Sequence, residues 1–367
     1  MVSEANIDRL HGLDFVRGLC AVAVMIYHYL HVSKIGTFYA AGTYGVYIFF
    51  VLSGFTLHQV YGSQEINETN LRRFFLNRAF RIMPLYIAVV GVQFLFASWG
   101  RVNVAEFALN VTLLFGLTNP GQTSGTPGGW SIGVEAVFYL LFPMLLLFRN
   151  TLSLGLVFIC TLAINHLYTG MTYTMPAMEK AHWTFHIQPT TFLCFFVGGM
   201  FLAKFGVPKM RTNQWMGAAI IVATMVAMFT LPHLLGVSRK EILAGWEAKL
   251  MIAASLAVVV LGAAVDLNGF LERLARFLGE ISYALYLIHL LVYGQVVRWL
   301  PEIGTLPTIA VSAALSVSLS KIIYDLFENP IRGWGKRWAA RRGPPAGTSI
   351  QRPLGTITPY GDGHTIP

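Results

Sequence analysis

Long apolar runs recur along almost the whole chain and are separated by short polar stretches. A run of this kind suits a transmembrane helix, which needs about 20 apolar residues to cross a bilayer. The pattern therefore predicts an all-α polytopic membrane protein, a bundle of about ten transmembrane helices. The predicted spans are residues 13–30, 44–61, 82–98, 130–148, 152–168, 190–204, 214–231, 249–265, 281–299 and 307–327.

Composition agrees with this pattern. The 367 residues are 55% hydrophobic and 12% charged, whereas about a quarter of a soluble domain is charged. We expect a cytoplasmic N-terminus over residues 1–12, a transmembrane domain over 13–330, and a basic, then disordered cytoplasmic tail over 331–367. The cysteines lie inside apolar runs and indicate packing rather than disulfides: Cys20, Cys160 and Cys194. The first apolar stretch lacks a small-residue cleavage site, so it is expected to be a span rather than a signal peptide.

The basic residues decide the predicted topology. If segment 104–117 stays at the outer surface, the inner segments hold 18 Lys and Arg and the outer segments seven, with Lys321 inside the last span. Counting 104–117 as a crossing would invert everything after it. Cytoplasmic loops carry the basic excess, so both termini are predicted to be cytoplasmic. The net charge of +9 is accordingly a topology signal, and no nucleic-acid partner is expected.

Three polar residues lie on one stripe of the first span, "LDFVRGLCAVAVMIYHYL". Arg17 and His28 are eleven residues apart, which returns an ideal helix to within about 20° of the same face after a rise of about 16 Å. Asp14 falls on the same stripe. Charges inside spans are costly and are functional candidates, although an Asp14–Arg17 pair could also simply anchor the inner end of the helix.

Two further groups are candidates. Arg78 and Arg81, with Arg73 before them, approach the third span from the inside, and arginine suits bidentate contact with phosphate. Ordinary positive-inside charge is the alternative. Glu135 is expected about 8 Å below the outer surface, at a depth similar to His28. The two side chains could then form a general base and its orienting partner, or a structural pair between helices.

The stretch "GEISYALYLIHL" places four polar residues along or near one helical face: Ser282, Tyr283, Tyr286 and His289. Substrate contact and core hydrogen bonding are both consistent with this spacing. The outer loop around 169–189 contains His182 and His186, which suggest either an interfacial loop or acceptor binding. The chain has no P-loop, HExxH, GxSxG or Cys/His metal cluster, so no metal site is predicted.

Together these stretches resemble the acyltransferase-3 family of integral membrane acyltransferases. The matching pieces occur in the family's order: "LDFVRG" followed by His28, "GVYIFFVLSGF", "RRFFLNRAFRIMPLY", "WSIGVEAVFYLLFP" beginning at Trp130, "ISYALYLIH" and "FENP". The chain departs from the pattern at Tyr47 and Ala136, where many members have acidic residues. It is similar to members without an appended extracytoplasmic hydrolase-like domain.

The resemblance implies an O-acyltransferase of the bacterial inner membrane. Such enzymes move an acyl group, often acetyl, from acyl-CoA to a hydroxyl of a cell-envelope glycan or lipid-linked sugar. It implies functional roles for Arg17 and His28, donor binding at Arg78 and Arg81, and an active-site role for Glu135. We expect His28 to act as general base oriented by Glu135, with an acyl-His28 intermediate as an alternative. Trp130, Ser282, Tyr286 and His289 are weaker candidates for substrate contact.

The competing function is a secondary transporter or flippase of a sugar-lipid, because buried arginine, histidine and glutamate side chains fit that function as well. Besides the acceptor, membrane lipids are the expected partners.

Overall fold

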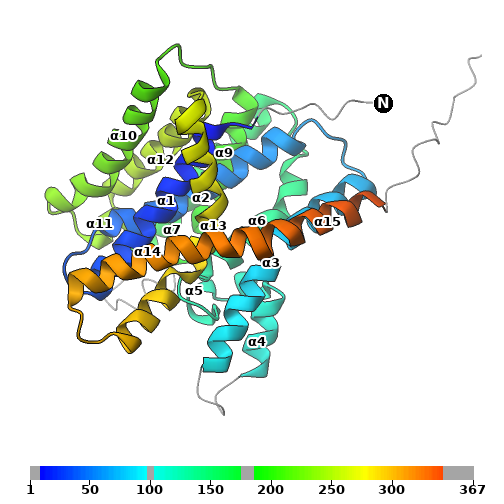
Figure 1. Ribbon diagram of the computed structural model, residues 1–367. Coiled ribbons are helices and arrows are strands. Elements are labelled where there is room, and N and C mark those ends of the chain that lie inside the picture. The colour runs from blue at the N-terminus through cyan, green and yellow to red at the C-terminus, as the bar shows by residue number, and fades with distance from the viewer. Residues whose placement is uncertain (1–8, 97–102, 175–185, 342–367) are drawn as a thin grey trace, which may run out of the picture.

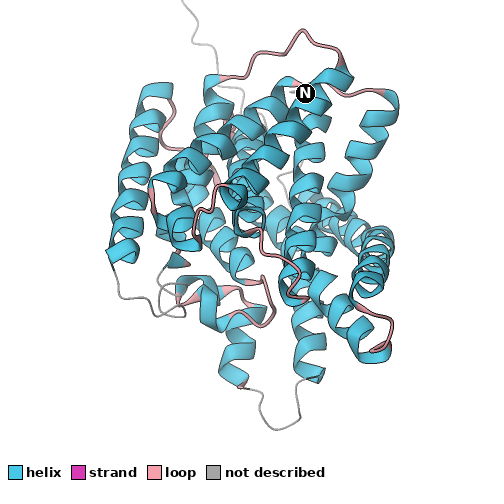
Figure 2. Ribbon diagram, turned by 90° about the vertical axis from the view of Figure 1, so that its left-hand side faces the viewer, coloured by secondary structure: helices cyan, strands magenta, loops and turns pink. Residues whose placement is uncertain are grey.

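The computed structural model describes residues 9–96, 103–174 and 186–341 (Figure 1). Within these ranges the chain folds into helices joined by loops, and Figure 2 shows no strand among them. The all-α prediction is confirmed. Eight helices are long and apolar enough to cross a membrane, which makes this a multi-pass membrane protein.

The long apolar helices are α1 (His11–Val32), α2 (Tyr39–Tyr61), α3 (Glu68–Phe96), α7 (Thr151–Thr174), α10 (Gln214–Leu234), α12 (Trp246–Ala264), α13 (Gly269–Trp299) and α14 (Thr305–Ile323). The other two predicted spans form α6 (Trp130–Leu145) and α9 (Pro189–Phe205), apolar helices of only 16 and 17 residues. The shorter elements are α4 (Val104–Val111), η1 (Leu114–Leu117), α5 (Pro120–Thr123), α11 (Arg239–Ala244), the π-helical η2 (Tyr324–Glu328) and α15 (Asn329–Arg341).

Segment 104–117 does not cross the bundle. Its helix α4 has eight residues, a rise of about 12 Å, which is less than half the apolar thickness of a bilayer. The segment folds back against α3 and α6. A Cβ on Gly116 would lie 2.1 Å from the Gly133 carbonyl oxygen, so η1 touches the first turn of α6. The first turn of α6 is therefore buried, and η1 is one of the segments that cover it.

Helix α1 lies at the centre of the bundle and packs on α2, α12 and α13. Its partners meet it at small residues: a Cβ on Gly12 would lie 2.1 Å from the Gly262 carbonyl oxygen of α12, and one on Gly18 would lie 2.2 Å from Leu278 Cβ of α13. Tyr29 near the end of α1 hydrogen-bonds α13 at His289. Because residue numbers rise together along the two helices, α1 and α13 run parallel.

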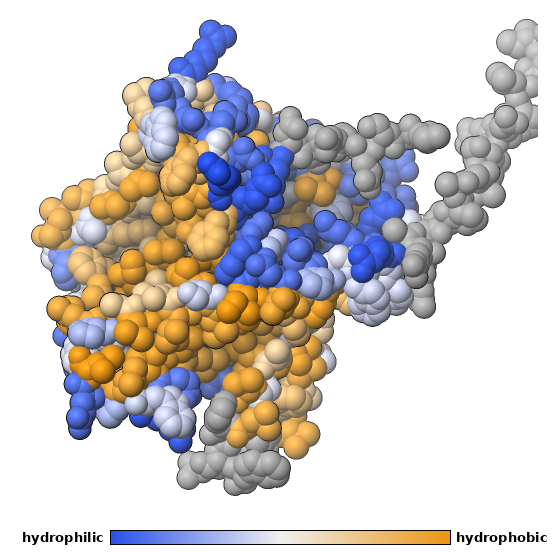
Figure 3. Space-filling view, in the orientation of Figure 1, coloured by the Kyte–Doolittle hydropathy of each residue, from blue (hydrophilic) through white to orange (hydrophobic). Residues whose placement is uncertain are grey.

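The ends of the bundle and its sides differ in polarity. Figure 3 shows a broad apolar surface over α13 and α14, with hydrophilic residues gathered towards the ends. Helices α14 and α15 form one rod across the front of the bundle, and α15 brings the described C-terminal end to the side where α1 begins (Figure 1). All three cysteines are free, as expected, with Cys20 and Cys194 buried and Cys160 exposed.

Helices α2 and α9 cross at a backbone-to-backbone contact. A Cβ on Gly54 would lie 1.9 Å from the Phe196 carbonyl oxygen, and one on Gly199 would lie 2.1 Å from the Val51 carbonyl oxygen. Small residues allow this close approach, which drives helix association in membranes through van der Waals packing. The contact also fixes the position of Ser53, one residue from Gly54.

Enlarging this contact should destabilise the bundle. The Gly199→Val substitution places side-chain atoms against the α2 backbone, which cannot move away cheaply, so we expect the thermal unfolding midpoint to fall by several degrees. Gly91→Ala is the matched control, because nothing lies within 4 Å of a Cβ there and its midpoint should not fall. An unchanged midpoint for Gly199→Val would show that α2 and α9 do not cross here.

The basic-residue distribution predicts that the α13–α14 loop faces outwards and α15 faces the cytoplasm. In a cysteine-free background, Glu302→Cys should react with a membrane-impermeant maleimide added to intact cells. Lys336→Cys should react only after permeabilisation. The reverse labelling pattern would overturn the predicted orientation while leaving the fold unchanged.

Candidate active site

A small cavity of about 60 Å³ lies where α1, α2, α3, α6 and α13 meet. Each of these helices contributes at least one polar side chain to its wall. The polar lining residues are Arg17, Ser53, Arg81, Ser131, Glu135, Ser282, Tyr283 and Tyr286. The structure thus brings six of the sequence-predicted residues to one cavity, from segments far apart in the chain.

The cavity carries more positive than negative groups. Arg17 and Arg81 line it from different helices, and Glu135 is the carboxylate that lines it with them. Two guanidinium groups that line one cavity in a low-dielectric environment repel each other, and this repulsion favours binding of an anion between them. Arg78 lies beside the same group with its guanidinium carbon 5.8 Å from the centre of the Tyr139 ring. Its buried Nε atom has no hydrogen-bond partner among the described residues, so it remains available to an anionic ligand.

Asp14 anchors the first turn of α1. Its carboxylate accepts hydrogen bonds from Arg9 Nε at 2.6 Å and from Arg17 Nη1 at 3.4 Å. Burial of Arg9 disfavours the charged form of its guanidinium group. The hydrogen bond to Asp14 nevertheless raises the pKa of Arg9 above its usual value. Asp14 does not line the cavity, and its contacts fit a side chain that positions Arg17.

Glu135 is held by two hydroxyl groups. Tyr139, one turn along the same helix, donates to Glu135 Oε1 at 2.5 Å, and Ser53 of α2 donates a short hydrogen bond to the same atom. A carboxylate that accepts two hydroxyl protons is fixed in position beside the arginines. Neither Ser53 nor Tyr139 was singled out from the sequence, although Tyr139 stands at the i+4 position of Glu135.

The structure does not place Glu135 beside His28, so the expected pairing of these residues is wrong. On α2, Gly45 lies against Val24 of α1, and the two helices run antiparallel. Ser53, eight residues further along α2, therefore lies near the level of Arg17. Since Glu135 is bonded to Ser53, it lies near the level of Arg17, about 16 Å along α1 from the level of His28.

His28 is instead paired with His289 of α13. Their Nδ1 and Nε2 atoms, respectively, are 2.9 Å apart, and His289 Nδ1 lies 2.9 Å from the Leu285 carbonyl oxygen. A carbonyl oxygen can only accept, so neutral His289 carries its proton on Nδ1 and accepts on Nε2. His28 must then donate from Nδ1, which leaves the lone pair of His28 Nε2 available to take a proton.

A cluster of aromatic side chains begins at Tyr27, beside His28. The Tyr27 ring lies 4.9 Å from the His28 ring between centroids, and it stacks on His31 at 5.7 Å. Tyr39 completes the group at 6.5 Å from Tyr27, and the Arg239 guanidinium carbon lies 5.5 Å from the centre of the Tyr39 ring. This cluster belongs to the end of the bundle opposite to Arg17.

Of the residues predicted to contact the substrate, some line the cavity and others do not. Tyr286 donates to the Gly128 carbonyl oxygen at 2.8 Å and lies one turn from His289, with 6.4 Å between ring centroids. It therefore connects the cavity to the histidine pair, and Ser282 lines the cavity below it. Trp130 packs against Phe192 at 5.6 Å and does not line the cavity.

Other predicted residues lie apart from the cavity. Arg73 does not line it. His186 is buried, hydrogen-bonds Tyr47 at 2.8 Å and does not line the cavity, whereas His182 lies outside the described residues. Within residues 9–96, 103–174 and 186–341, no group of three or more His, Cys, Asp or Glu side chains could hold a metal ion.

Sequence reasoning also passed over Glu328, although it stands in the quoted "FENP" stretch. This side chain is 6% exposed, and its Oε1 atom has no hydrogen-bond partner among the described residues. The signal was an acidic residue directly after an apolar span. It was not singled out because its π-helical setting brings it back towards α3 and α13, which sequence spacing does not reveal.

Comparison of the sequence with known proteins identifies a family and several relatives. A family model described as an acyltransferase domain, Acyl_transf_3, matches residues 10–325. The chain is 27% identical over 337 residues to the exopolysaccharide production protein ExoZ of Rhizobium meliloti, covering 86% of this chain and 98% of that protein.

Two further relatives carry acetyltransferase names. A protein of the Acidianus two-tailed virus is 24% identical over 322 residues, covering 83% of this chain and 89% of its own length. A protein of Staphylococcus aureus named for O-acetyltransferase activity is 21% identical over 357 residues, and the chain spans 57% of its length. No solved structure matches the chain.

Proposed function

Because the chain belongs to the Acyl_transf_3 family of acyltransferases, we propose that it transfers an acyl group, acetyl in the first instance, from acyl-CoA to a hydroxyl of an extracytoplasmic or lipid-linked saccharide. The name of its exopolysaccharide-production relative supports a glycan acceptor. The observation that carries the proposal is the placement of the His28–His289 pair next to Tyr286, which lines the cavity that also contains Arg17 and Arg81.

The donor is proposed to enter from the arginine end. Coenzyme A is polyanionic, and Arg17, Arg78 and Arg81 offer guanidinium groups that suit its phosphates. The thioester arm would then extend past Glu135 and Tyr286 towards His28. At about 60 Å³ the cavity is too small for that arm, so binding requires its walls to separate. Phe49 and Tyr286 line the cavity with their ring centroids 6.1 Å apart, and we propose that these two rings move apart to admit the thioester arm.

The acceptor is proposed to arrive from the opposite end, across the aromatic cluster of Tyr27, His31 and Tyr39. Its hydroxyl hydrogen-bonds His28 Nε2, and its oxygen attacks the thioester carbonyl carbon as the proton passes to that nitrogen. The tetrahedral intermediate collapses by breaking the carbon–sulfur bond, and the departing thiolate takes the proton from His28. The products are an ester and CoA thiol, which balances the reaction.

His289 takes over the orienting role first assigned to Glu135. It accepts from His28 Nδ1 while its own Nδ1 proton is committed to the Leu285 carbonyl, so it fixes both the orientation and the tautomer of His28. It is thus a positioning residue. Glu135, bonded to Ser53 and Tyr139, offsets part of the positive charge at the donor end.

Replacing either histidine should separate binding from transfer. His28→Ala should lower kcat for acetyl transfer by about 10²–10⁴-fold, the range expected for a lost general base, with acetyl-CoA affinity unchanged. Turnover is measured as acceptor-dependent CoA release from acetyl-CoA by the purified protein. Full transfer by His28→Ala would exclude the base role. Sugar-lipid translocation without CoA release would support the transporter alternative.

His289 should behave as a hydrogen-bond acceptor. His289→Leu removes the acceptor that His289 Nε2 provides to His28 Nδ1 and should reduce kcat strongly, whereas His289→Gln offers an amide oxygen and should recover much of the loss. KM for acetyl-CoA should stay unchanged in both variants. If the two variants lose activity equally while remaining equally stable, His289 does not position His28.

The arginines should act through the phosphates of the donor. The Arg78→Ala, Arg81→Ala double variant should raise KM for acetyl-CoA by at least about tenfold, because charge-assisted contacts are lost. KM for acetyl-pantetheine, which lacks those phosphates, should change little. Arg72→Ala, an exposed position on the same helix, is the control and should leave both values unchanged. An equal loss with both donors would contradict phosphate binding by these residues.

A further inference from the structure

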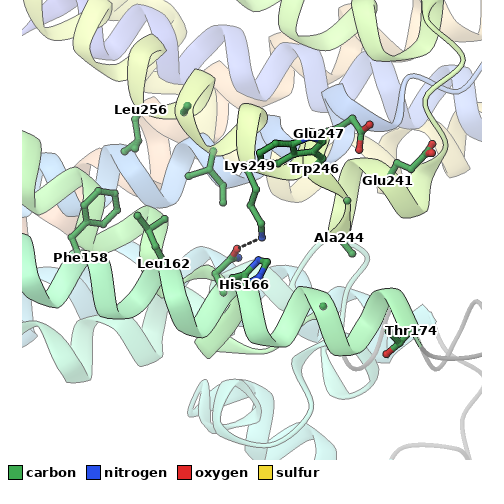
Figure 4. Close-up of a pocket in the computed structure, with 15 residues that line it drawn as sticks. Phe158, Leu162, His166, Thr174, Glu241, Ala244, Trp246, Glu247, Lys249 and Leu256 are labelled. Atoms are coloured by element: carbon green, nitrogen blue, oxygen red, sulfur yellow. Dashed lines mark hydrogen bonds between the residues drawn. The ribbon is translucent and has the colours of Figure 1, made fainter.

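A second, larger hollow lies away from the acyl-transfer site, between α7 on one side and α11 with α12 on the other (Figure 4). Its volume is about 940 Å³, within the usual range for small-molecule pockets. Helix α7 is peripheral, since only 17% of its apolar window is buried, and it packs mainly on α9 and α11. The hollow therefore lies in the wedge between α7 and α12, at the side of the bundle.

The hollow is apolar along one part and polar at one end. Phe158 and Leu162 of α7 face Leu256 of α12 along the apolar part (Figure 4). At the polar end, Trp246 is 79% exposed. An exposed tryptophan at the start of a membrane helix is typical of the membrane–water interface. The polar end therefore lies at headgroup depth, and the apolar part extends into the hydrocarbon region.

One cation marks the polar end. The Lys249 ammonium, labelled in Figure 4, donates to Asn165 Oδ1 at 3.1 Å and to Thr169 Oγ1 at 2.9 Å, both neutral acceptors. An ammonium group has three donors, and two are used. Among the described residues Lys249 forms no salt bridge. Its positive charge at the edge of the apolar part is therefore not offset by an ion pair, which favours an anionic group of a ligand.

Two carboxylates line the same end, Glu241 and Glu247. Glu241 accepts a hydrogen bond from the Ser238 backbone N–H at 2.7 Å, and this bond lowers its pKa, so it stays charged. A ligand with phosphate alone would meet Lys249 but be repelled by both carboxylates. A ligand that also carries an ammonium group satisfies all three charges.

We propose that this hollow binds a zwitterionic phospholipid whose headgroup carries a phosphate and a primary ammonium. The phosphate contacts Lys249, the ammonium lies between Glu241 and Glu247, and one acyl chain fills the apolar wedge. From Lys249 to Leu256 the helix rises about 10 Å, which gives the chain a path along α12. The lipid takes the place of direct side-chain packing between α7 and α12. This site is independent of the acyl-transfer reaction.

Lipid-dependent stability of the purified, delipidated protein tests the proposal. Phosphatidylethanolamine is the probe, and phosphatidylcholine and phosphatidylglycerol are the comparisons, since the first lacks N–H donors on its ammonium and the second has no ammonium. We expect phosphatidylethanolamine to raise the thermal unfolding midpoint, with about tenfold higher apparent affinity than the other two lipids.

Two variants and one control distinguish the contribution of Lys249 from that of the two carboxylates. Lys249→Met should lose the response to phosphatidylethanolamine, and Lys240→Met, which removes a nearby surface charge outside the hollow, should keep it. The Glu241→Gln, Glu247→Gln double variant keeps Lys249 and its two hydrogen bonds. It should bind phosphatidylglycerol at least as well as phosphatidylethanolamine.

Because this reversal of preference does not depend on folding losses at position 249, the test remains decisive if Lys249→Met is unstable. Equal responses of the wild-type protein to all three lipids would overturn the proposal. An unchanged preference in the double glutamine variant would do the same.

Discussion

The structure depends on the packing of α1 within the bundle, because this helix carries polar groups where lipid could not satisfy them. A polar side chain inside a membrane must find its partner within the protein. Asp14 and Arg17 bond each other, Tyr29 bonds α13 and α14, and His28 bonds His289. The bonds of Tyr29 and His28 require α13 to run parallel to α1 in one register. Glycines at the α1 contacts allow the close approach that sets it.

Much of the fold and part of the site could be predicted from the sequence, because both follow from periodicity along single helices. The apolar runs located the membrane helices, and helical spacing put Arg17 and Asp14 at one end of α1 and His28 towards the other. The depth of Glu135 could not be found in this way. The prediction assumed that α6 begins at the membrane surface, but η1 covers its first turn, with Gly116 against Gly133. Glu135 therefore lies deeper than counting residues suggested.

Partnerships between helices were equally hidden from the sequence. The His28–His289 bond joins residues 261 apart, and no spacing rule relates them. Ser53 could be found only after the α2–α9 crossing was known, because Gly54 sets its height against Glu135. His289 was considered for substrate contact, while its bond to the Leu285 carbonyl is what decides the tautomer of the pair. Side chains that act through another side chain need three-dimensional structure.

The distance between Arg17 and His28 along α1 has a consequence for the energetics of the proposed reaction. If the donor enters at one end and the acceptor at the other, an acyl group leaves the cytoplasmic side while the acceptor's hydroxyl proton ends on CoA thiol at that side. The reaction is then an exchange of one acyl group for one proton across the membrane, formally electroneutral. Because the hydroxyl and the CoA thiol are both neutral, no free proton is consumed or released, and neither membrane voltage nor a difference in proton concentration between the two sides enters its free energy.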